Sequence, residues 1–235
     1  MQRLFTILKV WSEAWAPLIP IFFLWRNRTQ PKYMRPVVVY ILLALPINII
    51  ADIIGDFHKN LPDLYWLQVN IYLYNIHSVI RFVCFSYFFI QLRQEYYSKF
   101  KKIIPILYLL FLVIDLGWFE NFFSSTSIGS HLFLVEAFLL MTYCLLYYLS
   151  KARDDQDEFT STPDIYVVTG LSIFVVTNFF VYLYYDSMMQ SNHKMADDIW
   201  IVPNVAYVIL CLFIAKAFTA SKSKIGRSDT LSLTS

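Results

Sequence analysis

Charged residues are scarce in this chain of 235 residues, and their scarcity argues against an ordinary soluble domain. Asp, Glu, Lys and Arg make up 15% of the sequence, whereas hydrophobic residues make up 58% and aromatic residues 19%. A soluble domain carries about 25% charged and about 45–50% apolar residues. The composition therefore predicts a polytopic membrane protein, and a net charge of +2 gives no reason to expect a nucleic-acid partner.

Cysteine is also rare, and the common catalytic motifs are missing. Cys84, Cys144 and Cys211 lie in different hydrophobic stretches, which argues against a disulfide framework or a CxxC metal site. The sequence has no HExxH, GxSxG or P-loop motif. Lys216 lies near the end of the last hydrophobic stretch, where a snorkelling lysine is expected rather than a retinal linkage. We expect neither a metal nor a cofactor.

Seven hydrophobic stretches are present, and each is close to the ~20 residues that cross a bilayer. Their approximate ranges are 4–25, 36–57, 66–92, 103–119, 131–150, 165–185 and 199–218. Lys9 and Glu13 interrupt the first, Pro17 and Pro20 are expected to kink it, and it lacks the cleavage site of a signal peptide. The fold class predicted is all-α, a seven-helix membrane bundle over residues 1–218 followed by a disordered tail over 219–235.

The basic residues predict the orientation of this bundle. The first, third and fifth loops carry four, four and two Lys or Arg, whereas the second, fourth and sixth carry one, none and one. The positive-inside rule then places the odd loops and the C-terminus in the cytoplasm and the N-terminus outside. We expect an integral protein of the bacterial inner membrane.

The third stretch carries a polar stripe that the other helices must accommodate. At helical spacing, one face of it holds Asn70, Tyr74, His77, Arg81 and Cys84. An ionisable residue inside a membrane span costs about 2.5–3.5 kcal/mol and normally has a partner in the bundle. Arg81 therefore needs an acid, for which Glu136 and Asp115 are the candidates.

Helices two to seven each place a polar group at a similar depth. With a rise of about 1.5 Å per residue, these groups fall within about 10 Å of the bilayer midplane, mostly on its outer side. The candidate ligand-binding residues are Asp52, Asn70, Tyr74, His77, Arg81, Asp115, Glu136, Asn178, Asn204 and Tyr207. Such a band either fixes helix packing through interhelical hydrogen bonds or forms a binding or proton-relay site.

Three stretches resemble helices of an uncharacterised family of bacterial seven-helix membrane proteins. They are Tyr74–Phe89, Thr162–Phe174 and Ile199–Leu210, which look like that family's third, sixth and seventh helices. The resemblance implies the seven-helix fold and brings no activity with it. The family often has Glu where this chain has Arg81, so no role for Arg81 follows from it.

A fainter resemblance is to the lysoplasmalogenase family of membrane hydrolases. It depends on Asp52 and Asp56, on the stretch Asn75–His77 and on Gly170–Phe179. It implies hydrolysis of a lipid ether with Asp52 or Asp56 and His77 as candidate acid–base catalysts.

The main hypothesis is a non-enzymatic membrane protein that binds a small ligand or a lipid in an outer-side polar pocket. It would pass a signal to a cytoplasmic partner through the basic loops. The Asp/His hydrolase is the alternative. A small transporter is a second alternative, although the sequence shows no internal repeat.

Overall fold

A computed structural model describes residues 11–57, 71–92, 97–115, 130–153, 162–191 and 199–232, and these ranges are helical with no strand. Two short helices come first, then one 3₁₀ turn and six long helices. They are α2 Ser12–Trp15, α3 Leu18–Arg26, η1 Lys32–Met34, α4 Arg35–Phe57, α5 Ile71–Gln91, α6 Ser98–Ile114, α7 Ser130–Arg153, α8 Pro163–Ser191 and α10 Ile201–Ser232. The predicted all-helical class is confirmed for the described residues.

Five of these helices are long and apolar enough to cross a bilayer, as expected of an integral membrane protein. The five segments are Lys32–Gly55, Tyr72–Gln91, His131–Arg153, Pro163–Tyr185 and Ile201–Ala220. The predicted first and fourth spans are not among them. The first is divided between α2 and α3, and the fourth corresponds to α6, which has 17 residues and begins at Ser98 rather than at 103. A count of seven spans therefore stays a prediction.

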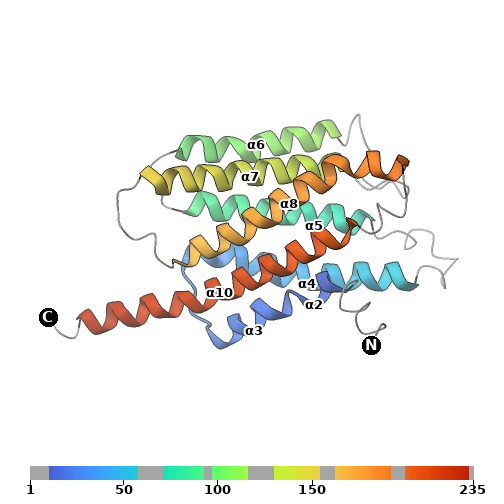
Figure 1. Cartoon of the computed structure of the whole chain (residues 1–235). Coiled ribbons are helices and arrows are strands. Elements are labelled where there is room, and N and C mark those ends of the chain that lie inside the picture. The colour runs from blue at the N-terminus through green and yellow to red at the C-terminus, as the bar shows by residue number, and fades with distance from the viewer. Residues whose placement is uncertain are drawn as a thin grey trace.

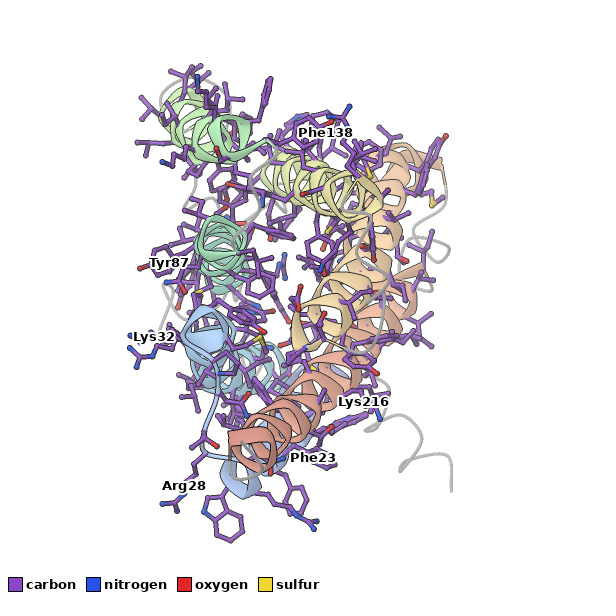
Figure 2. The ribbon with its side chains drawn as sticks, turned by 90° about the vertical axis from the view of Figure 1, so that its left-hand side faces the viewer. Phe23, Arg28, Lys32, Tyr87, Phe138 and Lys216 are labelled. Atoms are coloured by element: carbon purple, nitrogen blue, oxygen red, sulfur yellow. The ribbon has the colours of Figure 1, made fainter. Side chains whose placement is uncertain are left out.

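The long helices lie side by side and alternate in direction (Figure 1). One end of the bundle carries several basic side chains, and we call it the basic end. Segments that are separate in sequence come into contact there. Tyr147 donates a hydrogen bond of 2.7 Å to Asp164, and Arg153 lies over the ring of Tyr97 at 5.5 Å. The side chains of Arg28, Lys32 and Lys216 point away from the bundle at this end (Figure 2).

The outer surface of the bundle is largely apolar. Tyr87 of α5 and Phe138 of α7 are more than half exposed and point outward (Figure 2). Helix α6 is largely exposed, and Ile104 and Tyr108 are its only buried apolar residues. Such a surface suits lipid, in agreement with the composition.

The end of the chain differs from the prediction. Residues 219–235 are predicted to be disordered, but α10 continues to Ser232 and only 233–235 lie outside the described residues. A helix that is already nucleated adds residues at little cost. The tail has no proline that would stop it.

A hydrogen bond near the basic end attaches α6 to α7, and its loss gives a first prediction. The buried hydroxyl of Tyr143 donates to the backbone carbonyl of Lys101 at 2.7 Å. Tyr143→Phe is expected to lower the free energy of unfolding by about 1 kcal/mol, since it leaves a buried carbonyl without this donor. Tyr87→Phe on the exposed surface is the matched control and should leave stability unchanged. Equal thermal unfolding of the two variants in detergent would count against this role.

Candidate functional site

A buried ion pair crosses the centre of the bundle. Arg81 Nε donates to Glu136 Oε1 at 2.6 Å, and Arg81 Nη2 donates to Oε2 at 2.7 Å. Ser78 donates a further hydrogen bond to Glu136 Oε2, and the Arg81 guanidinium lies 4.9 Å from the ring of Phe174. Of the two acids predicted as partners for Arg81, Glu136 is the one that binds it. The pair joins α5 to α7 and neutralises the charge of Arg81.

His77 lies one turn before Arg81 and is enclosed by aromatic rings. Its imidazole stacks on Tyr40 of α4, with centroids 5.7 Å apart, and meets the edge of Tyr207 of α10 at 6.3 Å. The side chain is buried, and its Nε2 has no hydrogen-bond partner among the described residues. Arg81 lies within electrostatic reach of the imidazole.

The break between α2 and α3 leaves a backbone carbonyl to which Asn48 donates a hydrogen bond. Proline has no N–H, so Pro17 cannot donate to the carbonyl of Glu13 four residues earlier. The side chain of Asn48 takes this place, because its Nδ2 donates to Glu13 O at 2.9 Å. The same Nδ2 lies 3.5 Å from the hydroxyl of Tyr207. The break between α2 and α3 is thereby attached to both α4 and α10.

Two carboxylates, those of Asp52 and Glu13, lie on helices that meet at Asn48, and both are only partly buried. Asp52 follows Asn48 by one turn of α4, and Glu13 lies in α2. Both are within electrostatic reach of Tyr74, and Glu13 is also within reach of Arg81. The partly exposed Tyr182 of α8 lies within reach of Arg81, Glu13 and Glu136. The four helices α2, α4, α5 and α8 therefore share one polar region.

Asn178 belongs to the same region by its place on α8. It lies one turn after Phe174, which contacts Arg81 and Tyr207, and one turn before Tyr182. Its side chain is buried, and neither of its amide atoms has a hydrogen-bond partner among the described residues. We call His77, Asn48, Asn178, Glu13, Asp52, Tyr74, Tyr182 and Tyr207 the polar cluster.

The remaining predicted residues have other positions. Asp115 is buried at the end of α6 within electrostatic reach of His131, and it is not among the residues around His77. Asn204 is buried one turn before Tyr207 on α10. Asn70 lies outside the described residues, as does the side chain of Asp56.

Five residues of the region were not predicted from the sequence: Glu13, Ser78, Tyr40, Asn48 and Tyr182. Asn48 lies one helical turn before the predicted Asp52, and this spacing could have identified it. Glu13 carries the same signal as Asp115, an acid within a hydrophobic stretch, and that signal could have identified it. Ser78 follows the predicted His77 directly, and the prediction concerned a narrower stripe of this helix. Tyr40 and Tyr182 lie among many aromatic residues, and nothing in the sequence distinguishes them.

The arrangement favours hydrogen bonding and charge over metal chemistry. Among the described residues, no three His, Cys, Asp or Glu side chains come close enough together to hold a metal ion. What they offer is a satisfied ion pair, beside which lie free hydrogen-bonding atoms, two carboxylates and several aromatic rings. No family model, curated protein or solved structure matches the chain.

Proposed function

We propose that this chain is a membrane protein that binds a small molecule, or the polar head of a lipid, at the polar cluster. The observation that carries the proposal is the set of buried atoms without a hydrogen-bond partner among the described residues. Within the polar cluster, these atoms include His77 Nε2, Asn48 Oδ1 and both amide atoms of Asn178. Buried polar groups are nearly always hydrogen-bonded, so a concentration of free ones calls for a partner.

The Arg81–Glu136 pair has a different part in this proposal. Its carboxylate already accepts three hydrogen bonds, which leaves little capacity for a ligand. We assign it to holding α5 against α7 beside the cluster. This assignment combines the two interpretations of the polar band, because one part of the band fixes packing and the other part binds.

The proposal keeps the orientation inferred from the basic loops. The basic end then faces the cytoplasm of a bacterial cell, and α2 and the first turns of α5 lie toward the outer side. The partly exposed Glu13, Asp52, Tyr74 and Tyr182 are on the entry side of the cluster. A ligand that enters there can act on a cytoplasmic partner through the helices that end at the basic end.

Binding is better supported than an Asp52–His77 hydrolase. The imidazole of His77 packs against the rings of Tyr40 and Tyr207, and its Nε2 has no hydrogen-bond partner, Asp52 included, among the described residues. An acid and a base must lie within about 3 Å of a common point to cooperate. The charged group beside His77 on α5 is Arg81.

Mass spectrometry of the intact protein, extracted with its surrounding membrane, tests the proposal. We expect wild type to carry a bound small molecule or lipid that His77→Phe and Asn178→Leu lose largely. His77→Phe keeps a ring to stack on Tyr40, so a loss of the bound species in this variant would show that the imidazole nitrogens contribute to binding. Ser150→Ala is the matched control, because Ser150 Oγ is buried and unpartnered among the described residues but lies near the basic end. No bound species in wild type, or equal amounts in all four proteins, would refute the proposal.

A further inference from the structure

The hydrogen bonds of Asn48 fix which of its atoms faces the cluster as an acceptor. Glu13 O can only accept a hydrogen bond, so the atom of Asn48 that contacts it is the amide nitrogen. This leaves Oδ1 as the free atom. It is buried, in a side chain with 1% exposure, and has no hydrogen-bond partner among the described residues. A ligand that meets Oδ1 must bring a hydrogen-bond donor.

The charge around Asn48 favours a cation. Glu13 and Asp52 are both acidic, and both lie within electrostatic reach of Tyr74. The cation acting on Glu13 is Arg81, and its Nε and Nη2 are already bound to the two carboxylate oxygens of Glu136. Among the described residues, Arg81 and Glu136 together contribute no net charge, and Glu13 and Asp52 add two carboxylates to this side of the cluster.

Aromatic rings on the neighbouring helices suit an organic cation. Tyr207 lies against Asn48, and Tyr74 and Tyr182 lie near Glu13. Trp200 packs on Tyr182 at 6.1 Å. The faces of such rings attract an ammonium group. Among the described residues, no three His, Cys, Asp or Glu side chains come close enough together here to hold a metal ion instead.

We propose that the ligand of the polar cluster is a small organic ammonium ion that carries N–H donors. Glu13 and Asp52 provide the counter-charge, and Asn48 Oδ1 accepts one N–H bond. The proposal rests on the proposed function and names its ligand class. The same chemistry is present in a free primary amine and in the amine headgroup of a lipid.

Calorimetric titration of the full chain in nanodiscs of phosphatidylglycerol, which has no amine, provides the test. The probe is n-butylammonium chloride, with n-butanol as the neutral control and tetramethylammonium as the cation without N–H donors. We expect butylammonium to bind, tetramethylammonium to bind more weakly and butanol not to bind. Equal binding of the three compounds would overturn the inference.

Charge-removing variants locate the binding. Glu13→Gln and Asp52→Asn are each expected to weaken butylammonium binding at least about tenfold, which is about 1.4 kcal/mol. Asp52→Glu keeps the charge and should retain binding, which separates loss of charge from loss of folding. Asp164→Asn is the matched control, because Asp164 is a partly exposed carboxylate at the basic end. Unchanged affinity in both Glu13→Gln and Asp52→Asn would also overturn the inference.

The two proposals fail in different ways. A neutral or anionic species bound to wild type, with no binding of butylammonium, would reject the ammonium ligand and keep the binding site. No bound species and no titration signal would reject both. Repeating the titration in nanodiscs of phosphatidylethanolamine distinguishes the sources, since weaker apparent binding there indicates a competing lipid headgroup and unchanged binding indicates a free amine.

Discussion

Replacing Glu136 with alanine is expected to destabilise the protein by about 3–5 kcal/mol, the range found when one partner of a buried ion pair is removed. The variant would leave the guanidinium of Arg81 buried without its counter-charge and Ser78 without its acceptor. Aromatic contact with Phe174 does not replace a carboxylate. Denaturant or thermal unfolding of the purified chain in detergent measures the effect.

A double variant separates the charge from the packing. Arg81→Met combined with Glu136→Leu removes both charges and keeps apolar bulk, and such replacements are often neutral or stabilising. We therefore expect the double variant to recover most of the stability that Glu136→Ala loses. A double variant as unstable as Glu136→Ala would contradict the assignment of this pair to charge compensation. A loss of less than about 1 kcal/mol in Glu136→Ala, the value of an exposed pair, would contradict its burial.

The need of Arg81 for an acid was predictable, because a buried charge requires a partner wherever the fold places it. The sequence alone left Glu136 and Asp115 equally open. The structure decides between them through the position of α6, which packs at the edge of the bundle and leaves Asp115 near His131. Helix arrangement is a property of the whole bundle, and no local pattern in one helix contains it.

The position of Glu13, in contrast, could not be predicted, because it depends on a break in the helix. Its depth could be estimated only if residues 4–25 formed one continuous helix, and Pro17 ends that continuity. The break leaves the carbonyl of Glu13 without its usual backbone donor, and Asn48 donates to it across 35 residues of sequence. Local sequence predicts the break through the proline. Local sequence does not predict which residue donates to the free carbonyl of Glu13. The contact with Asn48 leaves Asn48 Oδ1 as an acceptor on the side of the cluster that holds the two carboxylates.

Gly170→Val is expected to destabilise the contact between α8 and α10 by about 1–3 kcal/mol or more, as overpacking of a well-packed core does. A Cβ at position 170 would lie 2.5 Å from Cβ of Phe213, 3.1 Å from its Cγ and 3.4 Å from Cα of Leu210. The nearest of these atoms is fixed to the backbone of α10, so rotation of a side chain cannot relieve it. Small residues permit this closeness between membrane helices.

The identity of the conflicting atom gives the control for this prediction. Gly170→Ala should stay destabilising in a Phe213→Ala background, because alanine keeps the Cβ that lies 2.5 Å away. In a Phe213→Gly background the conflict with Cβ disappears, and Gly170→Ala should become neutral or favourable, since alanine is the better helix former. The difference between the two backgrounds in thermal unfolding measures the contact alone. Equal effects of Gly170→Ala in both backgrounds would show that α8 and α10 do not meet at this position.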